Sequence, residues 1–347
     1  MKHAGLTVLA SLISLTLVGC GGDSGSSSST TPITLSVTDA PVDDAKEVVV
    51  TFGKVALLPQ GSDSPLVYDV YLTDENGNPI DENGNLIPDG EERVPLSVNL
   101  LDYQGSASLP LIKNEVVPVG SYKLCVFAND GDHPDYPSYV VENEADLVHP
   151  ELTVKGEGAC PQGVGKIDNA GVLYFNNAFT VNADNNDFAL EFDLRRGLRD
   201  DPQSAGDYVI QRTSVSLINT VTTGNIEGTV SLDTFTNCNS PTVDTAVQAV
   251  YLYDGSVTQD SMAPIYGTDE TKPLSSAAVN LSDDQSIYQF SFGFLEPGTY
   301  NLGYTCTAQH DDDVDNADPV AAGFSIYQVE AASVTVGADS TVTFTVP

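Results

Sequence analysis

The residues best suited to chemistry lie in an acidic segment between two apolar runs. Counted from Asp81, oxygen-bearing side chains fall at positions 1, 3, 5, 9 and 12, and a backbone carbonyl is available at position 7, which is the ligand spacing of a calcium-binding loop. The residues are Asp81, Asn83, Asn85, Ile87, Asp89 and Glu92. Leu86 stands where glycine normally allows the sharp turn, and asparagine twice replaces aspartate. The segment therefore predicts either a weak calcium site, with Kd of about 10⁻⁴–10⁻³ M, or a solvated, turn-rich insertion made by Asn-Gly duplication.

Other charged clusters are interpreted structurally. The acidic segments 129–135 and 310–318 contain His133 and His310, and their irregular spacing favours solvated loops over a second cation site. Asp39 is expected to cap a turn after the first strand. Three arginines form the only basic cluster, and we expect them to pair with nearby acids such as Asp193 and Asp200, with an anionic partner as the alternative. They are Arg195, Arg196 and Arg199.

Composition excludes some function classes. The chain carries 49 Asp and Glu against 13 Lys and Arg, a net charge of −36, which argues against binding nucleic acid or an anionic membrane unassisted. No nucleophile elbow, phosphate loop or His-Glu-x-x-His motif occurs. We therefore expect no enzyme activity and no certain cofactor, with Ca²⁺ as the one candidate ion.

The first residues indicate export. Lys2 is followed by an apolar run that is too short to span a bilayer and is typical of a signal peptide. The ending Leu17-Val-Gly-Cys20 resembles a bacterial lipobox. The resemblance implies a signal peptide at 1–19, cleavage before Cys20, acylation of that cysteine with palmitate-type chains, and a lipid-anchored protein. Gly21 after the cysteine favours the outer membrane of a Gram-negative envelope by resemblance to sorting rules, and residues 20–32 form a Gly/Ser tether.

The remaining four cysteines indicate disulfides, because an even number in an exported chain usually pairs. Three pairings are open. Cys125–Cys160 and Cys238–Cys306 are favoured, because each pair then lies inside one predicted domain.

The rest of the chain predicts an all-β protein. Short alternating or β-branched runs separated by Pro, Gly and Asn turns are typical of antiparallel β-sandwiches. Thr220–Gly224 resembles a boundary, so we expect two β-sandwich domains, at 33–220 and 224–347. Only Val98–Tyr103 and Ala145–Val148 are expected to form helical turns. The expected strands are Ile33–Thr38, Glu47–Leu58, Leu66–Leu72, Tyr122–Ala128, Val172–Val181, Phe188–Leu194, Tyr208–Ile218, Ile226–Leu232, Ala246–Tyr253, Ile287–Phe294, Thr299–Thr307, Ala322–Gln328 and Ser340–Val346.

Two similar motifs favour the interpretation that the two halves are related sandwiches, with independent use of a common strand-entry turn as the alternative. Pro118-Val-Gly-Ser-Tyr122 matches Pro297-Gly-Thr-Tyr300, and each is followed by a cysteine and an acidic loop.

Several motifs in order resemble one family. They are Leu35-Ser-Val-Thr-Asp-Ala-Pro41, Val48–Val55, Val98-Asn-Leu-Leu101, Phe179-Thr-Val, Phe188–Asp193 and Tyr208–Leu217. Together they resemble the bacterial lipoprotein domain of unknown function 4382 over about residues 33–220. The resemblance implies a β fold in the cell envelope and no assigned reaction. Gly228-Thr-Val and Leu295-Glu-Pro-Gly-Thr-Tyr300 are similar to carboxypeptidase-regulatory or prealbumin-like modules.

The sequence thus favours a lipid-anchored envelope protein that serves as a non-enzymatic binding, adhesion or structural module. A carbohydrate-binding accessory lipoprotein is the second hypothesis, and a calcium-assisted hydrolase the third. The expected partners are the membrane, through lipid on Cys20, and an envelope protein or a polysaccharide.

Overall fold

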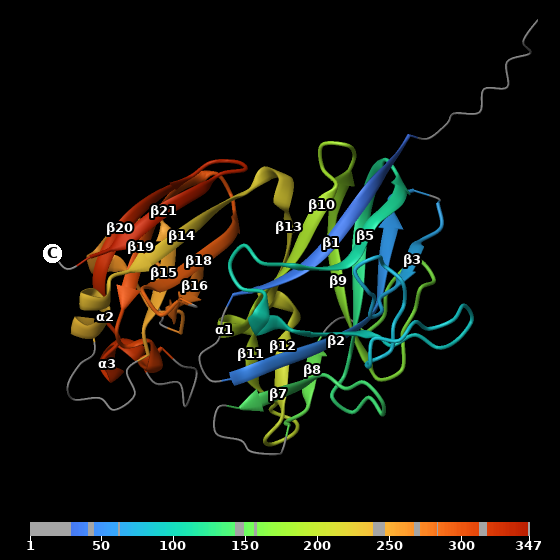
Figure 1. Ribbon diagram of the computed structural model, residues 1–347, viewed down its shortest axis with the longest axis horizontal. Coiled ribbons are helices and arrows are strands. Elements are labelled where there is room, and N and C mark those ends of the chain that lie inside the picture. Colours follow the sequence, from blue (N-terminus) through green and yellow to red (C-terminus); the bar gives the residue numbers. More distant parts are fainter. Residues whose placement is uncertain are drawn as a thin grey trace, which may run out of the picture.

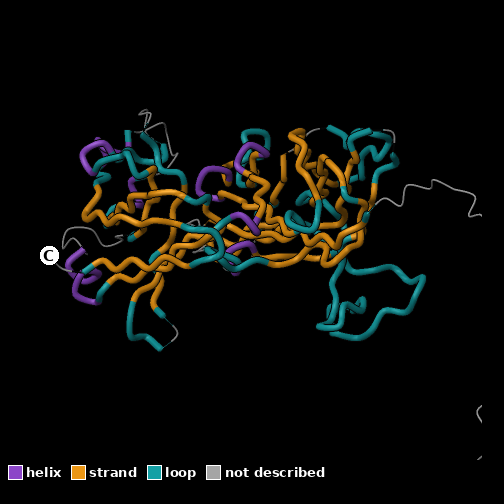
Figure 2. Tube along the Cα trace, turned by 90° about the horizontal axis from the view of Figure 1, so that it is seen from above, coloured by secondary structure: helices purple, strands orange, loops and turns teal. Residues whose placement is uncertain are grey.

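The chain folds into two groups of strands. The computed structural model describes residues 29–40, 45–61, 63–142, 149–155, 158–238, 247–266, 271–282, 284–311 and 318–345. Strands β1–β13 form a first half and β14–β21 a second half, which follow one another along the long axis of the molecule (Figures 1 and 2). The predicted all-β fold class is confirmed.

Two sheets build the first half. One has the order β13-β10-β1-β5, and the other has the order β3-β2-β6-β9, with β4 and β7 also paired to β2. A third, small sheet has the order β11-β12-β8. The strands are β1 (Thr30–Ala40), β2 (Ala45–Pro59), β3 (Leu66–Asp69), β4 (Leu96–Asn99), β5 (Leu109–Pro118), β6 (Gly120–Asn129), β7 (Tyr139–Glu142), β8 (Leu152–Lys155), β9 (Ala170–Val181), β10 (Asp187–Asp193), β11 (Leu198–Asp200), β12 (Tyr208–Gln211) and β13 (Val215–Asn219).

The alternation of residues along these strands places one apolar face of each sheet in a common core. In β10, Phe188, Leu190 and Phe192 are buried in this core, as their period of two predicts. Phe192 meets Phe52 of β2 edge to face, with ring centres 6.0 Å apart. The two sheets therefore pack face to face as a sandwich.

The second half repeats this arrangement. Its sheets have the orders β17-β18-β14-β21 and β16-β15-β19-β20. The strands are β14 (Gly224–Val230), β15 (Ala249–Asp254), β16 (Ser275–Ala278), β17 (Asn280–Leu281), β18 (Tyr288–Leu295), β19 (Gly298–Thr305), β20 (Ile326–Val334) and β21 (Asp339–Phe344). Side chains from both sheets share a core that includes Phe290, Leu302 and Phe344.

The sequence motif that the two halves share makes the same contact in each of them. The Tyr122 hydroxyl donates a hydrogen bond to the Pro118 carbonyl at 2.5 Å, and the Tyr300 hydroxyl donates one to the Glu296 carbonyl at 2.7 Å. In each case the bond reaches back four residues and fixes the entry to a central strand, β6 or β19.

Helices are short, and some expected strands differ. A 3₁₀ turn at Leu100–Asp102 lies inside the expected turn 98–103, whereas the turn expected at 145–148 lies outside the described residues. Three α-helices were not foreseen, namely α1 (Leu194–Gly197), α2 (Leu232–Cys238) and α3 (Pro319–Ala322). The strand expected at 322–328 begins only at Ile326, because Asp318 caps α3, proline occupies its first turn and Gly323 (φ +115°) ends it.

Two further details differ from expectation. Residues 208–218 form two strands rather than one, because a 3₁₀ turn at Arg212–Ser214 sends β12 and β13 into different sheets. The sheets are mixed, since β1–β10, β8–β12 and β14–β21 are parallel pairs. Parallel pairing needs long connections, and each of these pairs joins strands far apart in sequence.

Candidate functional site

The basic cluster lies on α1 (Arg195 and Arg196) and β11 (Arg199), at the side of the first half that meets the second. Asp193 caps this helix, since its Oδ1 accepts a hydrogen bond from the Arg196 backbone N–H at 3.1 Å. Its Oδ2 lies 3.1 Å from Arg196 Nε, so the expected ion pair with Asp193 is present.

The same arginines contact the second half. Arg196 Nη2 donates a hydrogen bond to the Pro273 carbonyl, and the Tyr266 hydroxyl donates one to the Arg195 carbonyl. The guanidinium groups of Arg195 and Arg199 lie over the rings of Tyr251 and Tyr266, at 5.7 and 5.1 Å from the ring centres. The arginine cluster therefore joins the two halves through one charge-assisted hydrogen bond, one hydrogen bond to its backbone and two cation–π contacts.

Two glycines allow the backbones of the halves to touch nearby. A Cβ atom at Gly293 of β18 would lie 2.5 Å from the carbonyl carbon of Gly105, which is closer than any real contact. Gly105 itself has φ +63° and would collide with Ser291 if it carried a side chain. Ser106, next to it, donates a hydrogen bond to Glu227 Oε1 at 3.2 Å. The loop 104–107 therefore packs directly against the sheet that contains β14 and β18.

Acidic side chains also meet at the junction. Burial raises the pKa of Glu191 to about 7, helped by the nearby Asp193 carboxylate and opposed by Arg196. Burial likewise raises the pKa of Asp193, against the effect of Arg196 and Arg195. Glu191 and Asp39 line a small cavity together with Ser276, with space for about one water molecule.

An open groove of about 550 Å³ lies between the loop 101–104 and the outer face of the sheet β17-β18-β14-β21. Hydroxyl and amide side chains dominate its walls, which also include the acids Asp102 and Glu227. The polar neutral residues are Gln104, Thr229, Asn280, Gln289, Ser291, Thr341 and Thr343. This groove is large enough for a ligand and is shaped by both halves.

The predicted calcium loop folds as one of two equivalent turns. Asp81 Oδ1 accepts hydrogen bonds from the backbone N–H groups of Asn83 and Asn85 at 2.9 and 2.8 Å. Asp74 does the same for Asn76 and Asn78, at 2.9 and 2.8 Å. Hydrogen bonds from the side-chain amides of Asn78 and Asn85, together with these backbone bonds, hold the pKa of Asp74 and of Asp81 below the usual value. The duplicated Asp-Glu-Asn-Gly-Asn segment therefore forms a pair of Asx-type turns.

The predicted calcium ligands, residues 81–92, all lie in the part of the chain that is described. There, no group of three or more His, Cys, Asp or Glu side chains is arranged to hold a metal ion. The calcium loop stays a prediction.

The two histidine-containing acidic loops have structural contacts. Both carboxylate oxygens of the buried Asp311 accept backbone N–H groups, from Ile265 at 2.8 Å and Tyr266 at 3.0 Å, and residues 312–317 lie outside the described chain. Asp318 caps α3. In the first loop, burial together with Asp132 raises the pKa of Asp130 to about 6. His133 Nδ1 accepts the N–H of Tyr136 at 3.1 Å.

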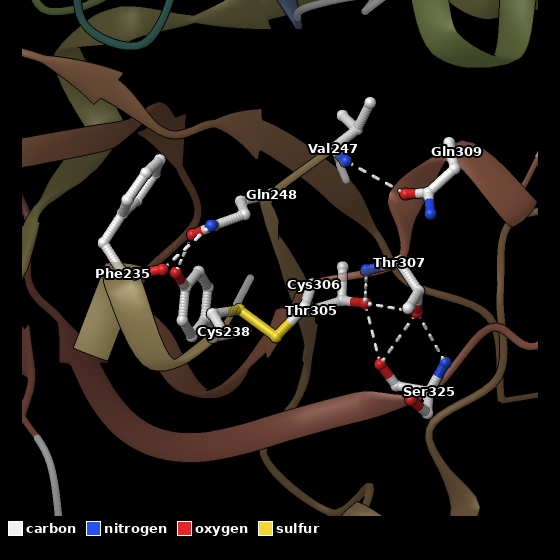
Figure 3. Close-up of a disulfide and its surroundings, with 10 residues drawn as sticks. Phe235, Cys238, Val247, Gln248, Thr305, Cys306, Thr307, Gln309 and Ser325 are labelled. Carbon is white, nitrogen blue, oxygen red and sulfur yellow. Dashed lines mark hydrogen bonds between the residues drawn. A yellow bond between two sulfur atoms is a disulfide. The ribbon is translucent and has the colours of Figure 1, made fainter. Parts of the chain in front are cut away.

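Both disulfides favoured by the sequence are present. Cys125 and Cys160 lie on the outer face of the sheet β3-β2-β6-β9, where they help to form a small second core with Phe127. Figure 3 shows Cys238, at the end of α2, bonded to Cys306 just after β19. Gln248 Nε2 donates to the Phe235 carbonyl at 3.0 Å beside this disulfide. Cys20 lies outside the described residues.

Nothing in the sequence pattern indicates which residues make the junction. Tyr251, Tyr266 and Pro273 carry no pattern that distinguishes them from core or loop residues. Gly293 did offer a signal, because an isolated glycine in an apolar strand indicates close approach of another backbone.

Comparisons with known proteins bear mainly on the first half. A family model described as "Domain of unknown function (DUF4382)" matches residues 30–211. No curated protein matches the chain. In the described part of the chain, no helix is both long and apolar enough to cross a membrane.

Two solved structures show distant likeness. One is a candidate adhesin from Bacteroides ovatus, with 10% identity over 91% of this chain and 93% of the other, and a TM-score of 0.18. The second is the fimbrial anchor protein Mfa2 from Porphyromonas gingivalis, with 11% identity over 88% and 99% of the two chains and a TM-score of 0.14.

Proposed function

We propose, from the premise that this chain belongs to the DUF4382 family, that it is a non-enzymatic binding module of the bacterial cell envelope, held at the outer membrane by lipid on Cys20. The observation that supports binding is the groove of about 550 Å³ that both halves line. Glycine contacts, cation–π contacts and hydrogen bonds hold the two walls of this groove together. A preorganised groove loses little conformational entropy when it receives a ligand.

The lipobox supports the anchor. One acyl chain binds a membrane only marginally, so stable attachment takes more than one chain, as lipidation of the Cys20 sulfur and amino group supplies. Metabolic labelling with radioactive palmitate should mark the wild-type chain and leave Cys20→Ala unlabelled. Outer-membrane fractions should contain the wild-type protein and lack the variant. Equal membrane recovery of the two forms contradicts the anchor.

Binding in the groove is tested in intact cells with a photo-crosslinking amino acid. Placed at Thr341, in the groove wall, it should give a discrete adduct. The matched control is the same amino acid at Lys113, exposed on β5 of the first half. Adducts of equal yield from the two positions, or none from Thr341, argue against a groove ligand.

A carbohydrate-binding role is the second candidate, and the neutral polar lining of the groove favours it. Threonine hydroxyls and asparagine or glutamine amides donate and accept hydrogen bonds, as sugar hydroxyls require. A glycan array probed with the purified full chain should show bound glycans. Thr341→Val with Thr343→Val should reduce that signal, and an unchanged signal places the sugar elsewhere.

A further inference from the structure

A separate hollow lies at the junction, and none of the described residues that line it is acidic. Its volume is about 640 Å³, and its charged residues are Arg196, Arg199 and Lys272. The other lining side chains are apolar or aromatic and include Tyr266 and Leu274. Three of the 13 basic residues of the chain therefore surround one opening, in a protein with 49 acidic residues.

We propose that this hollow binds an anionic saccharide through its carboxylate or phosphate group. This inference rests on the proposed binding function, because that function places the protein in the cell envelope. It adds a second site and names the class of ligand that binds there. Guanidinium groups match carboxylate and phosphate oxygens in pairs, and a lysine adds a point charge.

The arginines are held in place before any ligand arrives. Arg196 is fixed by Asp193 and by the Pro273 carbonyl, and the Arg199 guanidinium lies over the Tyr266 ring. Lys272 is exposed at the mouth. A ligand would thus meet two guanidinium groups that are already held in place and one exposed ammonium group, so ordering the arginines costs little conformational entropy.

The walls favour a sugar over an isolated inorganic anion. Leu274 is 50% exposed, and Ile265 and Pro273 continue the apolar surface. The C–H face of a sugar ring packs against such surfaces while its acidic group reaches the cations. The overall charge of −36 disfavours binding to an extended anionic surface such as a membrane. For a small ligand, physiological salt screens the repulsion from charges more than about 8 Å away, so the nearby cations dominate.

Calorimetric titration of the purified full chain tests the inference. The probes are tetragalacturonate, glucose 6-phosphate and, as the uncharged control, maltotetraose. We expect a charged probe to bind and maltotetraose not to bind. Lys272→Gln should weaken binding about tenfold, the loss expected for one hydrogen bond to a charged group. Lys113→Gln, which removes the same charge from exposed β5, should leave the affinity unchanged.

The outcomes are distinguishable. Binding of tetragalacturonate alone identifies a carboxylated glycan as the source, and binding of glucose 6-phosphate alone identifies a phosphorylated one. Three results would overturn the inference: equal binding of maltotetraose, equal affinity in Lys272→Gln, or no binding by either charged probe. The last result would mean that carboxylates of the chain itself neutralise the three cations. None of these results affects palmitate labelling or crosslinking from Thr341, so those two experiments test the proposed function independently.

Discussion

Arg196, on the first half, donates a hydrogen bond to the backbone carbonyl of Pro273, 77 residues further along the chain. The same side chain forms an ion pair with Asp193. One guanidinium group therefore ties the cap of α1 to the second half.

Arg196→Gln should lower the free energy of unfolding by about 2 kcal/mol, because hydrogen bonds to charged groups are worth about 1.5–3 kcal/mol. Urea denaturation measures this. Lys54→Gln is the control, since its ion pair with Asp69 (3.0 Å) is exposed and should contribute less than about 1 kcal/mol. Equal losses in the two variants would show that Arg196 does not join the halves.

Stability should fall as the pH rises from about 4.5 to about 7, because of Glu191. Its folded pKa, about 7, lies above the ordinary value, so the folded state holds a proton that the unfolded state has lost. Glu191→Gln mimics the protonated side chain. The variant should match the wild type near pH 4.5 and be more stable by about 2 kcal/mol above pH 7, a value reduced from the full shift because the residue is only partly buried.

Urea denaturation at half-unit pH intervals checks this prediction. Asp130, whose pKa is near 6, also makes the free energy of unfolding fall with rising pH, and it does so in both proteins. The difference curve therefore isolates Glu191, and a flat difference curve contradicts its raised pKa. Glu75→Gln, in the exposed insertion, controls for the chemical change itself.

Gly293→Ala should separate the two halves locally. The new methyl group would overlap the Gly105 carbonyl, and overpacking of this kind costs about 1–3 kcal/mol. Small-angle X-ray scattering should show a larger radius of gyration. Gly53→Ala is the matched control, because its Cβ would lie 3.6 Å from the nearest atom, an ordinary contact. An unchanged scattering curve for Gly293→Ala would mean that the halves shift without opening.

Each disulfide should contribute about 4 kcal/mol by loop-closure entropy, since the bridges close segments of 35 and 68 residues. Cys125→Ala with Cys160→Ala, and Cys238→Ala with Cys306→Ala, should each lower the thermal midpoint. Reducing agent should lower the wild-type midpoint further than that of either pair variant. A wild type insensitive to full reduction would contradict these contributions.

The duplicated turns provide an internal test of the calcium prediction. As turn formers, Asp81 and Asp74 make equivalent bonds, so Asp81→Ala and Asp74→Ala should lower the thermal midpoint by similar small amounts, with or without calcium. A calcium-induced rise in the wild type that is lost in Asp81→Ala and in Glu92→Ala, and is retained in Asp74→Ala, would instead establish the calcium loop at 81–92. Differential scanning calorimetry with and without chelator distinguishes the two results.

By itself the sequence determined the all-β class, most strand positions and the favoured cysteine pairs, because these depend on local alternation and on which segments share a sandwich. Phe188, Leu190 and Phe192 show this, since their period of two alone places them in the core. The hydrogen bonds that Tyr122 and Tyr300 donate to carbonyls four residues earlier also belong to a local sequence motif.

The tertiary structure decided how the charges are used. Arg195, Arg196 and Arg199 form a visible cluster in the sequence, but their contacts with Tyr251, Tyr266 and Pro273 depend on how two separately packed sandwiches meet. Burial also raises the pKa of Glu191, and this side chain lines a small cavity together with Ser275 and Ser276 of the second half. Local periodicity carries no information about which outer faces come together, so the junction, its groove and its cationic hollow were determined by three-dimensional packing alone.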